Sequence, residues 1–433
     1  MKAVILAAGD GTRMKPYHDG PKALVPLLGL TLIERTILSA KRSGIDDFLI
    51  VTGYKANLVK DKLGDGTNYQ VNITYVNNSD WRKENGLSLL KAQPLIGGRF
   101  VLLMCDHIYD QQILNYLAKR KPAILCTDSK VEQVFDIEDA TKVMLDKRAI
   151  LSLGKNITVF NSIDTGIFLF DARIFEALQR SIKKGDTTLS GAVRVLAKEN
   201  AIQSLDIKEK VWTDVDTQES LRHARKIILR GLKKTSDGPI SLYINRPLSV
   251  RLSSLLVNTK ITSNTLTIVS FMTALASAVF LSLGSHLYIA IGGIFAQAAS
   301  ILDGCDGEIA RLRLKESHYG AWLDSVLDRY SDAAIILGMT AGHYFAFHQP
   351  YVWPLGFFAL TGTFLNSYTA DKYDSIHKQA IPQKHQLRIG RDVRLFLVMV
   401  SGLMNQIVIF LGIISLITHV ENIRRLFMLR SID

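Results

Sequence analysis

Cysteine is scarce in this sequence, and the few cysteines present form no recognisable pattern. The 433 residues include three of them, Cys105, Cys126 and Cys305, whose spacing matches no metal-binding motif. We therefore expect neither a cysteine-held metal nor a disulfide framework, and we interpret the thiols as reduced side chains of an intracellular protein. Internal repeats and low-complexity segments are also absent from the sequence.

A signal peptide is not expected at the start of the chain. The first apolar stretch, Lys2–Ala8, is short and runs directly into a turn that contains Gly9 and Gly11. A short apolar run bounded by glycines is typical of a buried parallel strand. We interpret the first half of the chain as a soluble α/β protein.

Basic residues outnumber acidic ones and give a formal net charge of +12. Such a charge could suit a nucleic-acid-binding protein, but here the basic residues cluster beside long apolar runs. This distribution favours a membrane surface and anionic substrates as partners. We therefore expect a membrane-embedded last third of the chain and no nucleic-acid partner.

The most informative stretch lies between two of these apolar runs. It contains four aspartates in two pairs: Asp303 and Asp306, then Asp324 and Asp328. The members of the pairs are three and four residues apart, so each pair shares one face of a helix. If the flanking runs cross a bilayer in opposite directions, both pairs meet at one membrane face. Close carboxylates repel one another unless cations hold them, which predicts a site for Mg²⁺ or Mn²⁺. The alternative, a polar loop with incidental acids, is disfavoured because acids inside apolar runs are costly.

The spacing in this stretch resembles the signature of CDP-alcohol phosphotransferases at every fixed position. That resemblance implies a two-metal centre held by Asp303, Asp306 and Asp324. It places Asp328 at the same centre, as the base that deprotonates the hydroxyl of an acceptor. The residues expected beside the cytidine diphosphate are Gly307, Ala310, Arg311, Gly320 and, at the start of the first apolar run, Asn264.

A second motif follows the first predicted strand: L-A-A-G-D-G-T-R-M at Leu6–Met14, and then P-K at Pro21–Lys22. A glycine-rich turn between a strand and a helical pattern places backbone N–H groups where a triphosphate can bind. Arg13 and Lys22 are the candidate catalytic cations, since they could neutralise the phosphates during attack. Glycine alone is weak evidence, because any tight turn between a strand and a helix requires it.

The longer string resembles sugar-nucleotide and phospho-alcohol nucleotidyltransferases. The resemblance implies a Rossmann-like α/β domain in which Asp106 and Asp216 hold one Mg²⁺ between the α-phosphate and the incoming phosphate. Asp214 is a further candidate, and Asp164 would contact the phospho-alcohol. The residues that the resemblance assigns to nucleotide binding are Leu6, Ala7, Ala8, Gly9, Gly11, Thr12, Lys22, Asn85 and Gly86.

Some residues of this half admit two interpretations each. His107 follows Asp106 and could order a metal-bound water, but a histidine at the surface or at the edge of the core is the commoner case. Three lysines, Lys142, Lys147 and Lys155, could reach a substrate phosphate, although most lysines in such a domain are simply solvated.

Between the two halves, Ile240–Asn258 carries Arg246 and Arg251 among apolar residues. We interpret this segment as an amphipathic helix on the membrane surface, because it directly precedes the first long apolar run. The alternative is a linker helix packed on the first domain. The expected domains are a soluble domain (1–225), a linker with this helix (226–263) and a membrane domain (264–433).

The last third contains the candidate membrane spans. They are Thr265–Leu283, Leu287–Leu302, Gly320–Phe345, Tyr351–Tyr368 and Val393–His419, the last divided in two near Asn405–Gln406. This predicts an all-α domain of six transmembrane helices. Three connections on one side lack lysine and arginine, and the basic clusters lie on the other. The positive-inside rule therefore predicts a multi-pass protein of the cell membrane, with the soluble domain and both termini in the cytoplasm.

Three arginines near the start of the fifth predicted span are candidates for binding the phosphate of an acceptor. They are Arg388, Arg391 and Arg394. Guanidinium groups that face the cavity would suit a phosphate. Anchoring at the basic side of the membrane explains them equally well, so both interpretations stay open.

Together the two halves resemble a bifunctional family that joins an inositol-1-phosphate cytidylyltransferase to a di-myo-inositol-phosphate-phosphate synthase. The resemblance implies that CTP and inositol 1-phosphate give CDP-inositol, which then reacts with a second inositol 1-phosphate to form a compatible solute. It also implies two Mg²⁺ ions in the membrane site, one in the soluble site, and a homodimer. The rival interpretation is a phospholipid synthase that uses a lipid CDP donor and carries a non-catalytic nucleotide-binding module.

Overall fold

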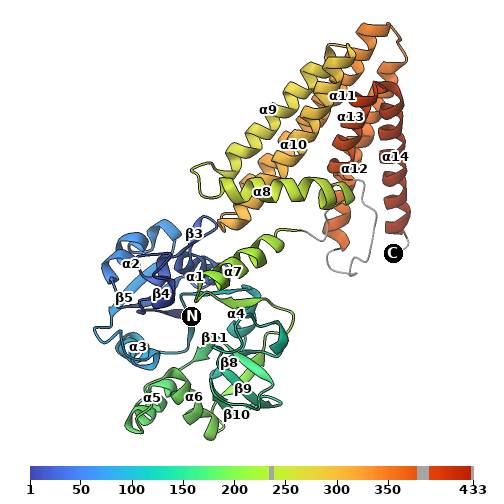
Figure 1. Cartoon of the computed structure of the whole chain (residues 1–433). Coiled ribbons are helices and arrows are strands. Elements are labelled where there is room, and N and C mark those ends of the chain that lie inside the picture. Colours follow the sequence, from blue (N-terminus) through green and yellow to red (C-terminus); the bar gives the residue numbers. More distant parts are fainter. Residues whose placement is uncertain (234–237, 378–389, 431–433) are drawn as a thin grey trace. The chain divides into compact units, whose positions relative to one another are not determined.

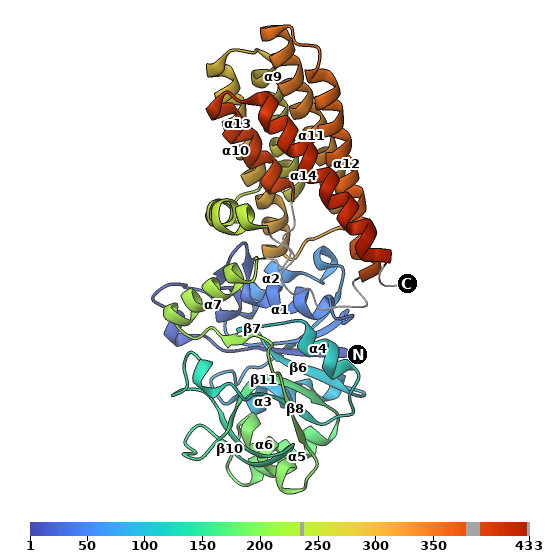
Figure 2. The same cartoon turned by 90° about the vertical axis from the view of Figure 1, so that its right-hand side faces the viewer.

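The computed structural model of this chain describes residues 1–233, 238–377 and 390–430. The chain divides into two compact units, Met1–Ile228 and Leu229–Asp433. Figures 1 and 2 show a sheet flanked by helices in the first unit and a bundle of long helices in the second. Each unit has its own buried hydrophobic core.

The first unit is built on a nine-stranded mixed sheet. In spatial order its strands are β5 (Asn72–Asn77), β4 (Asp47–Thr52), β1 (Lys2–Ala7), β6 (Phe100–Met104), β11 (Ser162–Phe170), β8 (Ile124–Asp128), β12 (Gln203–Asp206), β10 (Ala149–Gly154) and β9 (Lys142–Asp146). The first four strands are parallel, and β11 runs antiparallel to both β6 and β8. Two small sheets pair β7 (His107–Tyr109) with β13 (Trp212–Asp214) and β2 (Pro26–Leu27) with β3 (Leu30–Thr31).

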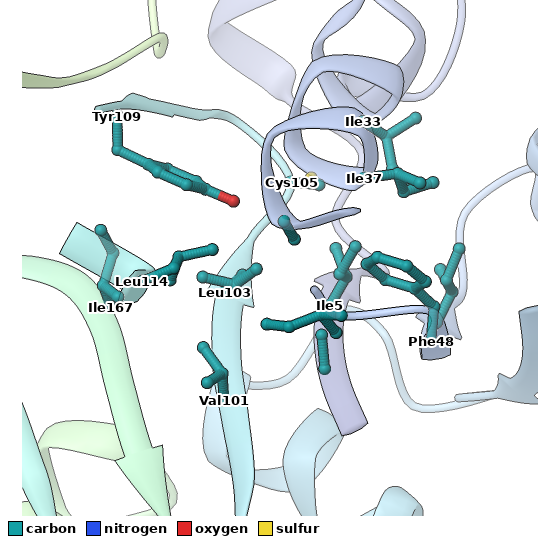
Figure 3. Close-up of a cluster of buried hydrophobic side chains, with 14 of the residues drawn as sticks. Ile5, Ile33, Ile37, Phe48, Val101, Leu103, Cys105, Tyr109, Leu114 and Ile167 are labelled. Atoms are coloured by element: carbon teal, nitrogen blue, oxygen red, sulfur yellow. The ribbon is translucent and has the colours of Figure 1, made fainter. Parts of the chain in front are cut away.

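Both faces of the large sheet are buried. Successive residues of its central strands point to opposite faces and therefore belong to different buried clusters. In β1, Ile5 belongs to one buried cluster, whereas Val4 and Leu6 belong to another. Figure 3 shows the first cluster, which includes Ile33 and Ile37 of α1. The helices of this unit are α1 (Leu32–Lys41), α2 (Ala56–Leu63), α3 (Asn85–Ala92), α4 (Gln112–Ala118), α5 (Arg173–Lys183), α6 (Leu189–Lys198) and α7 (Gln218–Arg230). Short 3₁₀ turns are η1 (Thr12–Met14), η2 (Lys22–Leu24), η3 (Thr67–Tyr69), η4 (Gln93–Leu95) and η5 (Val131–Gln133).

α1 begins where the sequence supplies a capping box. The hydroxyl of Thr31 accepts a hydrogen bond from the Glu34 N–H, and the Glu34 carboxylate accepts one from the Thr31 N–H. Both bonds satisfy donors that have no partner inside a helix. The chain after β3 therefore turns directly into the helix that covers the parallel half of the sheet.

The second unit is helical over most of its described residues. It opens with a π-helical turn, η6 (Ser241–Asn245), which leads into α8 (Arg246–Leu256). The longer helices that follow are α9 (Ser263–Ser282), α10 (His286–Leu312), α11 (His318–Phe347), α12 (Val352–His377), α13 (Arg391–Met404) and α14 (Ile407–Arg430). Within the described residues, α9, α10 and the Ile407–Phe427 part of α14 are long and apolar enough to cross a membrane. Six membrane spans therefore stay a prediction.

α8 buries polar side chains and exposes apolar ones. Arg246 Nη1 lies 2.7 Å from the Oε1 atom of Glu308 on α10. The hydroxyls of Ser249 and Ser253 donate hydrogen bonds to the same carboxylate, at 2.6 and 2.7 Å. Leu255 of α8, by contrast, is 71% exposed. An outward apolar side suits contact with lipid, which favours the predicted surface helix over a simple linker.

Candidate active sites

The first candidate site lies after the carboxyl end of β1, where the chain makes its glycine-rich turn. Gly11 has a φ of +64°, a conformation that residues with side chains rarely adopt. A Cβ atom on Gly11 would lie 2.6 Å from the Cβ atom of Lys22. Glycine at this position therefore permits both the turn and the close approach of Lys22.

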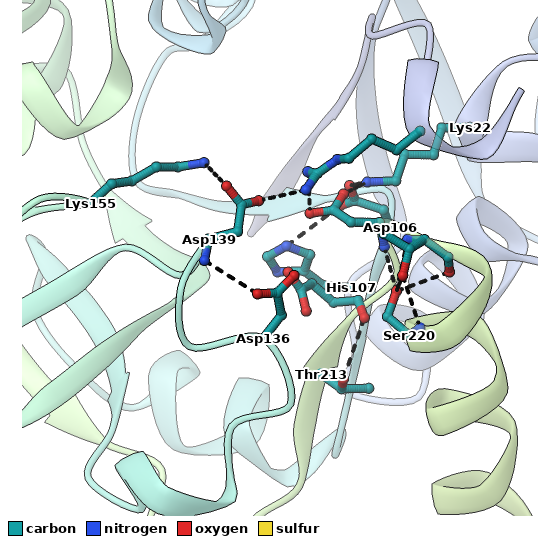
Figure 4. Close-up of polar contacts among 12 residues, drawn as sticks. Lys22, Asp106, His107, Asp136, Asp139, Lys155, Thr213 and Ser220 are labelled. Atoms are coloured by element: carbon teal, nitrogen blue, oxygen red, sulfur yellow. Dashed lines mark hydrogen bonds and ion pairs between the residues drawn. The ribbon is translucent and has the colours of Figure 1, made fainter.

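Lys22 is the centre of a charged cluster in this site (Figure 4). Its ammonium group contacts the carboxylates of Asp106, which follows β6, and Asp216, which follows β13. Arg13 donates a hydrogen bond to Asp216 at 2.8 Å. Although burial alone would raise the pKa of Asp106, the Lys22 ammonium lowers it to about 2. Asp106 is therefore ionised at neutral pH, as a ligand of a hard divalent cation must be.

A further carboxylate of the cluster comes from a loop that the sequence did not single out. Asp139 accepts hydrogen bonds from Arg13 at 2.9 Å and from Lys155 at 2.6 Å. Figure 4 shows the Lys155 side chain reaching Asp139. The Lys155 ammonium is thus paired with Asp139 rather than simply solvated. No local pattern marks Asp139, because Arg13 is 126 residues away from it in the sequence.

The charged cluster borders a cavity of about 360 Å³. The predicted site residues on its wall are Leu6, Ala8, Gly9, Arg13, Lys22, Asn85, Asp106 and Asp216, and Asp164 and Asp214 join them. Asp164 accepts a hydrogen bond from the Gly166 N–H at 2.7 Å, and burial raises its pKa to about 6. Burial likewise raises the pKa of Asp214. The cavity therefore has a cationic side at Lys22 and acidic groups elsewhere on its wall.

Some predicted residues support this cavity without forming its wall, namely Ala7, Gly11, Thr12 and Gly86. A Cβ atom on Gly86 would lie 2.4 Å from the carbonyl oxygen of Thr187, so this glycine lets α3 pack closely against the chain before α6. His107, by contrast, lies on the wall of the cavity, with its Nδ1 atom 2.8 Å from the Thr165 carbonyl oxygen and its Nε2 atom 3.5 Å from Asp106.

The second candidate site lies between α10 and α11. α10 carries Asp303 and Asp306, and α11 carries Asp324 and Asp328. One oxygen each from Asp303, Asp324 and Asp328 lies within 4.8 Å of the others. Three carboxylates at this separation form a suitable donor set for a divalent cation such as Mg²⁺.

Asp306 is oriented differently from the other three aspartates. Its carboxylate accepts a hydrogen bond from the hydroxyl of Thr267 on α9. It also lines a neighbouring cavity of about 180 Å³, which Asp324 borders as well. All the residues expected beside the cytidine diphosphate lie on this wall: Asn264, Gly307, Ala310, Arg311 and Gly320. Three aspartates thus lie together, and the fourth, Asp306, shares the wall of the neighbouring cavity with one of them, Asp324.

Arg391, the first residue of α13, supplies the cation of this second site. Its Nη1 atom lies 2.9 Å from Asp303 Oδ1 and 2.6 Å from Asp328 Oδ1. The same arginine lines another cavity, of about 210 Å³, together with Asp303, Asn245, Arg246, Ser249 and Ser300. Arg391 therefore connects the aspartate cluster with a second polar cavity.

The other two predicted arginines have different positions. Arg394 is buried, and its Nη2 atom lies 2.9 Å from Oδ2 of Asp332. Arg388 lies outside the residues that the structure describes. Asp332 was not among the predicted site residues, because it follows the last position of the aspartate motif. Its spacing of four residues from Asp328 is the signal that could have placed it on the same helix face.

Two family models match the chain in consecutive regions. A model of the MobA-like NTP transferase domain matches residues 3–202, and the model of CDP-alcohol phosphatidyltransferases matches residues 260–420. The first region contains Lys22 and Asp106 but ends before Asp216, and the second contains all four aspartates of α10 and α11. The first unit therefore has a nucleotidyltransferase fold, and the second is a helical domain of a membrane-associated type.

Curated proteins named bifunctional IPC transferase and DIPP synthase resemble the chain over most of its length. The one from Aquifex aeolicus is 34% identical, over 98% of this chain and 97% of its own. The one from Archaeoglobus fulgidus is 35% identical, over 94% of this chain and 79% of its own. The one from Thermococcus kodakarensis is 33% identical, over 92% of this chain and 89% of its own.

Proposed function

Because this chain belongs to the family of bifunctional IPC transferases and DIPP synthases, we propose that its two units catalyse consecutive reactions. The first unit joins CTP to inositol 1-phosphate and releases diphosphate. The second transfers the inositol phosphate of CDP-inositol to another inositol 1-phosphate, forming di-myo-inositol-phosphate-phosphate and CMP. One observation carries the proposal: each unit holds a cation among aspartates, beside a cavity lined by its own motif.

In the first reaction, a phosphate oxygen of inositol 1-phosphate attacks the α-phosphorus of CTP, and the bond to diphosphate breaks. Arg13 and Lys22 bind the phosphates and stabilise the charge that develops on them. Asp106 and Asp216 would hold one Mg²⁺ ion, whose charge would offset the repulsion between the two phosphates. The lowered pKa of Asp106 supports this role, since it keeps the carboxylate ionised over the physiological range.

In the second reaction, a hydroxyl oxygen of the acceptor attacks the phosphorus that carries the donor's inositol. Asp328 takes the hydroxyl proton, and the bond to the CMP oxygen breaks. The aspartates of α10 and α11 would hold two Mg²⁺ ions, which would supply positive charge to neutralise the diphosphate. Asp324 borders the cavity of the donor and Asp303 borders the cavity that Arg391 lines, which supports entry of donor and acceptor from different sides.

The phosphate of the acceptor binds to Arg391, with Arg394 nearby and Arg388 as a further candidate. Arg391 is on the wall of the 210 Å³ cavity and contacts Asp328, the proposed base. A phosphate held there would bring the rest of the acceptor close to that base. Guanidinium groups bind phosphate through paired N–H donors, which also fixes its orientation.

We further propose that the helices α9–α14 cross the membrane, with the soluble unit and both termini in the cytoplasm. The sequence supports this, because three connections on one side carry no lysine or arginine. Large aromatic side chains also face outward, including Trp322 on α11 and Phe357 on α12, which are 61% and 62% exposed. Such exposed apolar surface suits a lipid environment.

The proposal is tested by supplying the purified full-length protein with CTP, Mg²⁺ and inositol 1-phosphate alone. We expect diphosphate, CMP and di-myo-inositol-phosphate-phosphate. The Asp106→Ala protein should release no diphosphate, yet it should still convert added CDP-inositol. A protein that ignores CDP-inositol and instead transfers from a lipid CDP donor would be a phospholipid synthase, and the proposal would be wrong.

A further inference from the structure

Asp332 is a buried carboxylate of α11 that no motif position covers. It lies four residues after Asp328 and therefore on the same face of the helix, one turn further along. Its side chain is only 3% exposed. A carboxylate is costly to bury, so it is expected to have charged partners.

Both oxygens of Asp332 are engaged by arginines of α13. Its Oδ1 atom lies 3.3 Å from the Nε atom of Arg391, and its Oδ2 atom lies 2.9 Å from the Nη2 atom of Arg394. The two arginines are three residues apart on their helix, and their side chains are 12% and 5% exposed. Two guanidinium groups this close repel each other, and the carboxylate between them offsets that repulsion.

The atoms that Asp332 contacts determine which guanidinium nitrogens of Arg391 stay available to a ligand. On Arg391 it contacts Nε, while Nη1 of the same planar group lies against Asp303 and Asp328 at the polar cavity. Fixing Nε fixes the plane of the guanidinium group, and thus the direction in which its two terminal nitrogens point.

We propose that Asp332 is a positioning residue for the acceptor: it orients Arg391 and Arg394 so that they bind the acceptor's phosphate. This inference rests on the proposed function, since it takes those arginines as the phosphate site. Asp332 itself contacts no reacting atom. Its removal should therefore weaken binding of the phosphorylated acceptor and leave binding of the donor intact.

The principal test compares Asp332→Asn with the unchanged protein, both full-length, in the second reaction. We expect the KM for inositol 1-phosphate to rise about tenfold or more, because hydrogen bonds to charged groups depend on orientation. The KM for CDP-inositol should stay within about twofold, and the first reaction should be unaffected. The preference for inositol 1-phosphate over unphosphorylated inositol as acceptor should fall about tenfold, because only the former has the phosphate.

Glu421 offers a matched control in the same unit. Its side chain on α14 is 6% exposed, and its carboxylate pairs with Arg424 at 2.8 Å and Arg425 at 3.2 Å. Glu421→Gln thus also removes a buried charge that holds two arginines. We expect both variants to lower the thermal stability of the protein, but only Asp332→Asn to change the KM for inositol 1-phosphate.

If Asp332→Asn does not accumulate, the double variant Asp332→Asn/Arg394→Gln removes one charge of each sign and should fold more readily. Its KM for inositol 1-phosphate should exceed that of Arg394→Gln alone, since Arg391 has also lost its anchor. An unchanged KM for inositol 1-phosphate, or an equal rise for donor and acceptor, would overturn the inference. So would the same rise in Glu421→Gln. Failure of the unchanged protein to use CDP-inositol would instead count against the proposed function.

Discussion

The two units of this protein place a cation among aspartates in different ways. In the first unit, Lys22 contacts Asp106 and Asp216, which are 84 and 194 residues away in the sequence. In the second, Arg391 contacts Asp303 and Asp328, which belong to one short motif on two adjacent helices. The first arrangement depends on the topology of a sheet, and the second depends on the periodicity of helices.

This difference determines which kind of substitution should impair each site. At strand ends, single loop residues set the site, so the backbone of the turn at Gly11 matters as much as the charges. Between helices, the spacing along the chain determines where each aspartate lies. Substitutions that remove a carboxylate charge should therefore impair the second site most. The predictions below separate the two sites on that basis, beginning with the largest effect.

The largest effect is expected from Asp328→Asn. Loss of the base should slow the second reaction by about 10³-fold, within the range that general bases contribute. CDP-inositol should then accumulate from CTP and inositol 1-phosphate, because Asp106 and Lys22 are untouched. Chromatography of the nucleotides measures both steps in one mixture. Loss of diphosphate release as well would show that the sites are not separate.

A smaller effect, on the first reaction instead of the second, is expected from Gly11→Ala. The added Cβ would need a strained positive φ and would lie 2.6 Å from Lys22 Cβ, so the turn or Lys22 must move. We expect the first reaction to slow by about 10–100-fold, since small misplacements of a binding group have effects of that size. Conversion of added CDP-inositol should be normal.

Gly44→Ala is the matched control for Gly11→Ala, because Gly44 also has a positive φ, of +78°, but a Cβ atom there would meet no atom within 4 Å. Its diphosphate release should equal that of the unchanged protein. If the two alanine variants behaved alike, the close approach of Lys22 to the turn would not matter for the reaction.

The smallest effect concerns stability rather than rate. Burial raises the pKa of Asp164 from 3.8 to about 6, so the folded protein binds this proton more tightly than the unfolded chain. The contribution of Asp164 to stability therefore falls as the pH rises from about 4 to 6. Asp164→Asn removes this cost, and it should stabilise the first unit by about 1–3 kcal/mol at pH 8.

At about pH 3, where the folded protein and the unfolded chain both keep Asp164 largely protonated, Asp164→Asn should have little effect on stability. Hydrogen exchange of the β11 amides in the full-length protein measures the difference at both pH values. A stability difference between Asp164→Asn and the unchanged protein that did not depend on pH would mean that burial does not raise the pKa of Asp164.

The sequence predicted the second site in more detail than the first because helical spacing is visible in one dimension. Four aspartates were expected to converge, and Asp303, Asp324 and Asp328 do so, whereas Asp306 lies outside that group. The residues expected beside the nucleotide share one cavity. α10 continues beyond the predicted end of its apolar run at Leu302 to Leu312, so its aspartates lie within a continuous helix.

The residues that sequence reasoning missed are those whose partners are distant. Asp139 meets Arg13 across 126 residues, and Asp332 meets Arg394 across 62. Neither separation leaves a periodic signal in the sequence. Asp332 also lies inside a predicted apolar span and outside the aspartate motif. Gly86 shows the converse, because its motif suggested a nucleotide contact while its backbone packs against Thr187.

The most direct test of the central claim mixes two proteins that each lack one reaction, Asp106→Ala and Asp328→Asn, with CTP, Mg²⁺ and inositol 1-phosphate. Neither should form di-myo-inositol-phosphate-phosphate alone. The mixture should form it, because the second protein supplies CDP-inositol and the first consumes it. A mixture that accumulates CDP-inositol without the final product would contradict two separate sites that act in sequence.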